Sequence, residues 1–98
     1  MIKVIAYNYV KKDQQDAFLT KANQLIEHTQ KEKGCMQYSL NKVIGEESTY
    51  VFIETWETED DLKAHLSTKN FKDICQAFSV TLAKKGQIIK LKEIEKHE

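Results

Sequence analysis

The chain has 98 residues, the size of one domain, and we expect a single domain over residues 1–98. Apolar residues make up 41% and charged residues 31%, a balance typical of a globular rather than a disordered protein. Fifteen lysines offset fifteen acidic residues and arginine is absent, which argues against a nucleic-acid-binding module. The sequence has no apolar stretch of about 18–20 residues, the length that a membrane span requires, so none is predicted. The first residues lack a signal-peptide pattern, so we expect a cytoplasmic protein.

The first third of the chain predicts a strand followed by a helix. Residues 2–10 form a strand pattern whose two faces are both largely apolar, which a strand with one solvated face does not need. Asp13 is a candidate N-cap for a helix over 14–33, where apolar residues recur at helical spacing. Gly34 is then expected to end this helix, because glycine readily adopts the left-handed conformation found after helix C-termini.

The middle of the chain predicts a hairpin and a short helix. Residues 35–43 alternate weakly, and residues 49–56 are rich in β-branched and aromatic side chains, so the two runs predict paired strands. Thr58 is a candidate N-cap with Asp61 as its capping-box partner. We expect this helix to break near residues 67–69.

The last third predicts a second helical stretch and a final strand. A stripe at helical spacing comprises Phe71, Ile74, Cys75, Phe78 and Leu82. Gly86 is expected to end this helix, and residues 87–94 to form the last strand. The resulting β-α-β-β-α-β order predicts an α+β, ferredoxin-like fold with four antiparallel strands and helices on one face.

The second apolar face of the predicted sheet needs a cover. Helices can cover only one face, yet Ile5 and Ile53 place apolar side chains on the other. A second copy of the chain is the simplest cover, so we expect a homodimer. Tyr7, Tyr9 and Tyr50 are candidate interface residues.

Short motifs occur in a characteristic order along the chain. They comprise Val4-Ile5-Ala6, Gly34-Cys35, Tyr38, Glu54-Thr55-Trp56, Leu62-Lys63-Ala64-His65, Ser67 and Phe71. Together they resemble the signature of antibiotic-biosynthesis-monooxygenase domains over essentially the whole chain. The ordered set, rather than any single motif, carries this resemblance.

The resemblance implies a fold, an assembly and an activity. It implies a homodimer whose sheets pack face to face as a dimeric α+β barrel, which agrees with the two apolar strand faces. The best-known members are small oxygenases that act on quinols and polyketide phenols without metal or flavin. We therefore expect a monooxygenase that needs no cofactor and oxidises a hydroquinone or polycyclic phenol with molecular oxygen.

Three residues are the candidate catalytic groups. His65 is the candidate base because an unperturbed imidazole titrates near pH ~6.5, although a structural histidine at the helix break is the alternative. Asn8 is a lone amide on an apolar strand face, and related enzymes use an Asn at this position of the first strand; a bond to a neighbouring strand end is its alternative. Trp56 could stack on an aromatic substrate or fill the end of the core.

Five further residues are candidates for the wall of a substrate pocket: Tyr38, Phe52, Phe71, Cys75 and Phe78. Tyr38 could donate its hydroxyl to a ligand. Cys75 lies on an apolar helical stripe, where a free cysteine usually acts as a small hydrophobic residue.

Several other kinds of site are not expected. The spacing of His28, His65 and His97 relative to the two cysteines does not match a zinc site, so no metal is expected. Without a glycine-rich phosphate loop, a nucleotide cofactor is not expected either. Glu54 and Glu57 are predicted to point to opposite faces of a strand end, and therefore not to form an acid–base pair.

Two other functions stay open at the level of the sequence. Haem-degrading monooxygenases of the same fold share the Asn at position 8, but they carry Trp where this chain has His65 and the iron-ligating His where it has Cys75. A barrel that binds a small aromatic ligand without catalysis would use the same pocket residues. Oxygen uptake on reduced quinones would separate an enzyme from such a binding protein.

Overall fold

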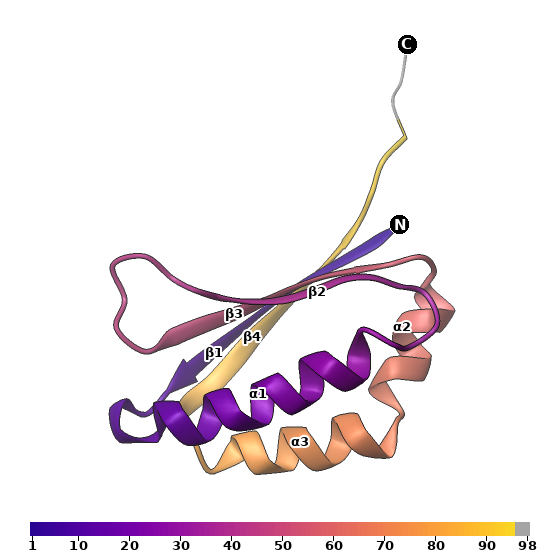
Figure 1. Ribbon diagram of the computed structural model, residues 1–98. Helices are drawn as coiled ribbons and strands as arrows, with labels where there is room; N and C mark the ends of the chain where they lie inside the picture. Colours follow the sequence, from indigo (N-terminus) through magenta and orange to yellow (C-terminus); the bar gives the residue numbers. More distant parts are fainter. Residues whose placement is uncertain (96–98) are drawn as a thin grey trace.

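The computed structural model describes residues 1–95 and has an α+β architecture, one antiparallel sheet with helices on one face (Figure 1). In chain order its elements are β1 Ile2–Val10, α1 Gln15–Thr29, β2 Cys35–Lys42, β3 Thr49–Trp56, α2 Glu59–Leu66, α3 Lys69–Ser79 and β4 Leu82–Lys92. The predicted ferredoxin-like order is confirmed, with the second helix divided into α2 and α3. His97 lies outside the described residues.

The sheet has the strand order β2-β3-β1-β4, with every neighbouring pair antiparallel. Glu54 on β3 lies opposite Val4 on β1 and Tyr38 on β2, and Val4 lies opposite Lys90 on β4. Residues paired in this way point to the same face of a sheet. One row on the face toward the helices therefore carries Tyr38, Glu54, Val4 and Lys90.

Threonine caps explain why the second helical segment starts, breaks and starts again. The Thr58 hydroxyl accepts a hydrogen bond from the backbone N–H of Asp61 at 3.1 Å and begins α2. The Thr68 hydroxyl accepts from the N–H of Phe71 at 3.1 Å and begins α3. The predicted cap at Thr58 and the predicted break are both confirmed.

The first helix is shorter than predicted at both ends. Asp13 lies in a turn of 3₁₀ helix, Lys12–Gln14, so its predicted role as N-cap is wrong. At the other end, the N–H of Glu32 donates to the carbonyl of Thr29 at 2.9 Å, and the chain leaves the α-helical path. Residues 30–33 have no apolar side chain to hold them against the sheet.

Gly34 has a structural role, although it lies beyond the helix that it was predicted to end. Its φ of +80° is in the left-handed region that favours glycine. Its carbonyl accepts a hydrogen bond from the N–H of Glu57 at 2.8 Å. The Asp61 side chain occupies the space where a Cβ would lie. The turn between α1 and β2 is thereby fixed to the start of α2.

The last strand begins five residues earlier than predicted. Both the backbone N–H and the hydroxyl of Thr81 donate to the carbonyl of Phe78, at 2.8 and 2.7 Å, which ends α3. Leu82, predicted as helical, is the first residue of β4. Gly86, predicted to end the helix, lies inside this strand, where a side chain would collide with the backbone carbonyl of Tyr7. The strand is irregular here, which hides its alternation in the sequence.

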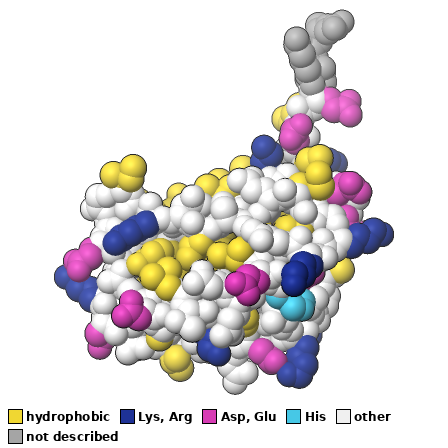
Figure 2. All heavy atoms as spheres, in the orientation of Figure 1, with side chains coloured by type: hydrophobic (Ala, Val, Ile, Leu, Met, Phe, Trp, Pro, Cys, Tyr) yellow, Lys and Arg dark blue, Asp and Glu magenta, His cyan; other side chains and the backbone are white. Residues whose placement is uncertain are grey.

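Aromatic residues fill much of the core between the sheet and the helices. The rings of Phe18 and Phe78 lie 4.6 Å apart between centroids, and Tyr50 packs against Phe18 at 5.3 Å. The Tyr50 hydroxyl donates to Gln15 at 2.6 Å. Its predicted place at a dimer interface is therefore wrong, because the ring points toward the helices. Figure 2 shows hydrophobic side chains at the surface along the seam between the sheet and the helix layer.

The opposite face of the sheet carries an apolar row across β3, β1 and β4 and is not covered by any element among residues 1–95. Ile5 lies between Ile53 on β3 and Ile89 on β4. Ile53 and Ile89 are 38% and 36% exposed, so this row forms an exposed apolar strip. Within the described chain, no helix combines the length and apolar character that crossing a bilayer requires.

Candidate functional site

A cavity of about 360 Å³ lies between the inner face of the sheet and the helices. Apolar and aromatic side chains make most of its wall, with polar side chains at four positions: Asn8, Glu54, Lys85 and Lys90. Asn8 and Glu54 project from the inner face of the sheet, whereas the two lysines are exposed on β4. The cavity is therefore an apolar space with a few polar groups, an arrangement typical of small-molecule sites.

The five predicted wall residues all line this cavity: Tyr38, Phe52, Phe71, Cys75 and Phe78. They come from β2, β3 and α3, so the fold brings together residues that are far apart in the sequence. Burial raises the pKa of the Tyr38 hydroxyl, with a further contribution from nearby Glu54. The phenol is therefore neutral near pH 7. A role of these residues in substrate binding stays a prediction.

Asn8 lies on the cavity wall near the end of β1. Its side-chain nitrogen donates to the carbonyl of Ala6 at 3.3 Å, two residues back on the same strand. No hydrogen bond to its side-chain oxygen occurs among residues 1–95. The amide is therefore partly satisfied by its own strand and keeps capacity for a ligand.

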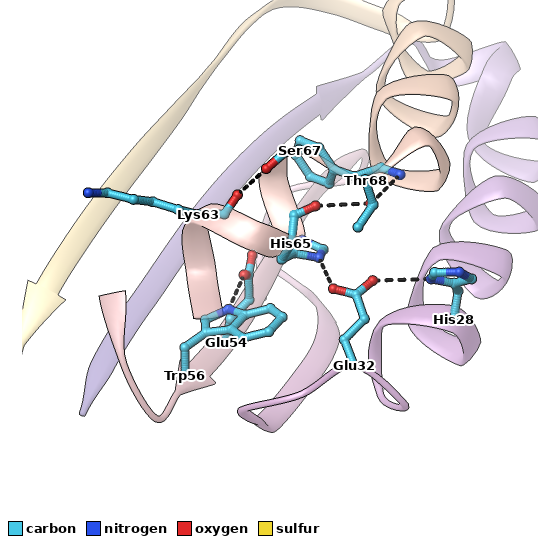
Figure 3. Close-up of polar contacts among 9 residues, drawn as sticks. His28, Glu32, Glu54, Trp56, Lys63, His65, Ser67 and Thr68 are labelled. Atoms are coloured by element: carbon cyan, nitrogen blue, oxygen red, sulfur yellow. Dashed lines mark hydrogen bonds and ion pairs between the residues drawn. The ribbon is translucent and has the colours of Figure 1, made fainter. Parts of the chain in front are cut away.

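His65 is completely buried and is held by Glu32 from the turn after α1 (Figure 3). The distance from Nδ1 of His65 to the Glu32 carboxylate is 2.9 Å, and the other carboxylate oxygen lies 3.1 Å from Nδ1 of the half-exposed His28. Burial lowers the pKa of His65, and the bond to Glu32 offsets part of this effect. A neutral His65 that donates from Nδ1 to Glu32 keeps a lone pair on Nε2, which has no partner in the described chain.

The structure does not place His65 or Trp56 on the cavity wall. Aromatic rings surround the imidazole: Trp56 and Phe71 lie at 4.7 Å and Tyr38 at 5.5 Å between centroids. Tyr38 and Phe71 also line the cavity, whereas the side chains of His65 and Trp56 are fully buried behind the lining residues. The catalytic roles predicted for His65 and Trp56 stay predictions.

Glu54 is a site residue that was not selected from the sequence. Glu54 lines the cavity and is only 6% exposed. The indole N–H of Trp56 donates to Oε1 of Glu54 at 2.9 Å (Figure 3). Burial raises the pKa of Glu54 to about 7, although the bond from Trp56 lowers it in part. The sequence does contain a signal for this residue. Strand alternation puts Glu54 on the same face as Tyr50, Phe52 and Trp56, so that a carboxylate lies among large aromatic residues.

The two cysteines are free and remain protonated near neutral pH. Burial raises the pKa of both Cys35 and Cys75, and the negative charge of Glu54 adds to the effect. Neither thiol is therefore activated as a nucleophile. Among residues 1–95, no three His, Cys, Asp or Glu side chains form a group that could hold a metal ion.

Comparison with known proteins identifies the family. Residues 1–77 match the family described as antibiotic biosynthesis monooxygenase. The chain belongs to this family. A Bacillus subtilis protein named "Putative monooxygenase YcnE" is 39% identical over 72 residues, which cover 74% of this chain and 76% of that protein.

Solved structures extend the likeness to the whole antibiotic biosynthesis monooxygenase fold. A conserved protein from Methanosarcina mazei has a TM-score of 0.93 at 30% identity, covering 95% of this chain and 92% of that one. A structure described as an antibiotic biosynthesis monooxygenase has a TM-score of 0.91 at 26% identity, covering 97% of this chain and 100% of that one. The family match ends within α3, so the structures supply the likeness for β4.

Proposed function

We propose that the chain is a monooxygenase that oxidises a hydroquinone or a polycyclic phenol with molecular oxygen and needs no cofactor. The observation that carries this proposal is the aromatic cavity, which contains the amide of Asn8 and the buried carboxyl group of Glu54. A cavity of about 360 Å³ suits one small aromatic molecule. Membership of the family and the name of the Bacillus subtilis relative support an oxygenase reaction.

The proposed substrate supplies all the electrons that the reaction needs. Removing a phenolic proton leaves an electron-rich anion, which passes one electron to oxygen. The resulting pair of radicals combines to form a carbon–oxygen bond. For a hydroquinone, the overall change is hydroquinone plus oxygen to hydroxyquinone plus water, which balances without an external reductant. The protein has to bind the ring, exclude water and stabilise the oxyanion.

The polar residues of the site have different access to such a substrate. The proposed role of Asn8 is to hold a ring oxygen, which is supported by its position on the cavity wall and by an amide that is only partly used by its own strand. His65 was predicted as the base, and its free Nε2 lone pair suits that role chemically. The imidazole nevertheless lies outside the cavity wall, so His65 can take a substrate proton only if Tyr38 or Phe71 moves.

The proposed assembly is a cytoplasmic homodimer. The exposed row formed by Ile5, Ile53 and Ile89 supports it, because a sheet face of this kind needs an apolar cover. In a dimeric α+β barrel, the same face of a second chain supplies that cover. The interface would then be isologous, with each residue of the row near its own copy.

Oxygen consumption tests the proposed activity. The purified protein is mixed with a panel of reduced benzoquinones, naphthoquinones and polycyclic phenols, and oxygen uptake is recorded with and without protein. We expect at least one compound to be consumed faster with protein and to gain one oxygen atom, measured by mass spectrometry with labelled oxygen. Tight binding of these compounds without turnover would instead identify a protein that only binds aromatic ligands.

A further inference from the structure

We propose that Glu54 is the group that takes the phenolic proton from the substrate, and that Trp56 and His65 position its carboxyl group. This inference rests on the proposed function, and it assigns the proton to a residue on the cavity wall. Glu54 lies near the centre of the sheet, between Tyr38 on β2 and Val4 on β1. Its side chain therefore lines the cavity from an interior strand of the sheet.

The hydrogen bond from Trp56 fixes one oxygen of the carboxyl group and leaves the other available. The indole N–H donates to Oε1 at 2.9 Å. No hydrogen bond to Oε2 occurs among residues 1–95, and this oxygen is not fully buried. Since Glu54 lines the cavity, Oε2 is the atom that can receive a proton from a bound hydroxyl group.

A chain of contacts holds Trp56 in place. The indole ring packs on the imidazole of His65 at 4.7 Å between centroids, and Nδ1 of His65 is bound to Glu32 at 2.9 Å (Figure 3). Glu32 lies in the turn after α1, so the position of Glu54 depends on contacts from three separate segments. Trp56 and His65 are thus positioning residues, since neither reaches the cavity.

The surroundings allow Glu54 to change its charge near neutral pH. The titratable groups that face it are Tyr38 and Cys35 from β2 and Cys75 from α3, while Lys90 on β4 shares its row across the sheet. Burial raises the pKa of the phenol and of both thiols, so these three groups stay uncharged. Burial also raises the pKa of Glu54 to about 7, which suits a base that works near neutrality.

The proposed step is a single proton transfer. The O–H bond of the bound phenol breaks, its electron pair stays on the phenolate oxygen, and the proton forms a bond to Oε2 of Glu54. The carboxylate becomes a neutral carboxylic acid while the substrate becomes the anion that reacts with oxygen. No oxidant or reductant takes part in this step.

Steady-state kinetics with matched variants test the assignment. We expect Glu54→Gln to lower turnover by about 10²–10⁴ and to abolish the fall of activity on the acid side. Glu57→Gln, an exposed neighbour outside the cavity, is the control and should keep the parent profile. We expect Trp56→Phe to move the acid limb to higher pH, because it removes the hydrogen bond that favours the carboxylate. We expect His65→Gln to lower turnover while keeping the acid limb.

The opposite pattern would overturn the assignment. If His65→Gln abolishes the acid limb and Glu54→Gln keeps it, the base is His65 and not Glu54. Thermal melting of each variant shows whether lost activity reflects unfolding. Should Trp56→Phe fail to fold, the comparison of Glu54→Gln with Glu54→Asp still tests the assignment, since Asp keeps the acid but shortens its reach.

An infrared measurement separates failure of this inference from failure of the proposed function. The carbonyl band of a buried protonated carboxyl group is recorded below and above neutral pH, and Glu54→Gln identifies it. Resorcinol, a dihydroxybenzene that does not form a quinone, is then added. A frequency shift of the band supports contact between Glu54 and the phenol even if every quinol proves inert. An unmoved band with resorcinol bound overturns the inference.

Discussion

The indole of Trp56 and the imidazole of His65 pack against each other with ring centroids 4.7 Å apart and an interplanar angle of 31°. Each ring also makes one hydrogen bond to a carboxyl group, Trp56 to Glu54 and His65 to Glu32. Two acidic residues that are far apart in the sequence are thus connected through a pair of packed, mutually tilted rings. The arrangement explains how residues behind the cavity wall can influence chemistry inside it.

The stability of a Glu54→Gln variant should depend on pH relative to the parent. Because burial raises the pKa of Glu54 from 4.5 to about 7, the folded parent binds more protons than the unfolded chain between these values. The parent therefore loses stability as pH rises through this range, whereas the amide of the variant does not titrate. We expect the variant to gain up to about 3 kcal/mol relative to the parent between pH ~4.5 and ~8, measured by urea unfolding. A difference that stays constant with pH would contradict the shifted titration.

His65→Ala should destabilise the fold as well as reduce activity. The imidazole is 1% exposed and is enclosed by Trp56, Tyr38 and Phe71. Its removal leaves a cavity and takes one of the two histidine partners from the Glu32 carboxylate, and we expect a loss of about 2–4 kcal/mol in the free energy of unfolding. Urea unfolding measures this loss, with Lys21→Ala, an exposed residue of α1, as the control. Unchanged stability would show that the ring is not packed as described.

Asn8→Ala should slow turnover less than loss of the base. The substitution removes one amide that can hold a ring oxygen, and a hydrogen bond of about 1–2 kcal/mol corresponds to a factor of roughly 5–30 in rate. We expect kcat to fall within this range and the pH profile to keep its shape. The measurement is initial oxygen uptake on the best quinol. Asn41→Ala, on the edge strand β2 and outside the cavity, serves as the control.

The exposed apolar row should hold two chains together. An obligate interface typically buries on the order of 2,000 Å² or more, and sedimentation at micromolar concentration should give about twice the chain mass of 11.4 kDa. Ile53→Lys should shift the mass toward that of a single chain, because it places charges in the row beside Ile5. Ile44→Lys, in the exposed hairpin turn, should leave the mass unchanged. A parent that sediments as a single chain would show that the face is covered differently.

Much of the fold could be predicted from the sequence because strand-forming runs and helix caps are encoded by neighbouring residues. The span 2–10 and the cap at Thr58 were predicted as observed, since β-branched runs and capping threonines act over a few residues. The start of β4 was missed because Leu82 continues the apolar spacing of α3, while the hydrogen bonds of Thr81 that end the helix depend on geometry. Tyr50 was misplaced because strand alternation does not reveal which face the helices cover.

The candidate site was predictable only in part, because some of its residues follow from periodicity and others depend on packing between distant segments. The wall residue Phe78 was selected as a large apolar group on a core-facing position, which sequence periodicity reveals, whereas Tyr38 was selected as a candidate hydroxyl donor. Glu54 was set aside because it was weighed only as one of a pair with Glu57. Its burial and its bond to Trp56 result from packing between three segments, and no short motif encodes them. A single carboxylate at the inward position of an aromatic strand is the pattern that should have been weighed.

The turn at Gly34 makes a residue without a side chain important for the chemistry inside the protein. Glu32 sits on this turn, and the backbone at Gly34 is tied to Glu57 and packed under Asp61. Any substitution at position 34 has to displace Asp61 or distort the turn that carries Glu32, the residue bound to His65. Mutational screens for lost activity should therefore identify substitutions at position 34 as well as substitutions of the residues that line the cavity. In a survey based on distance to the ligand alone, such variants would look like remote surface changes.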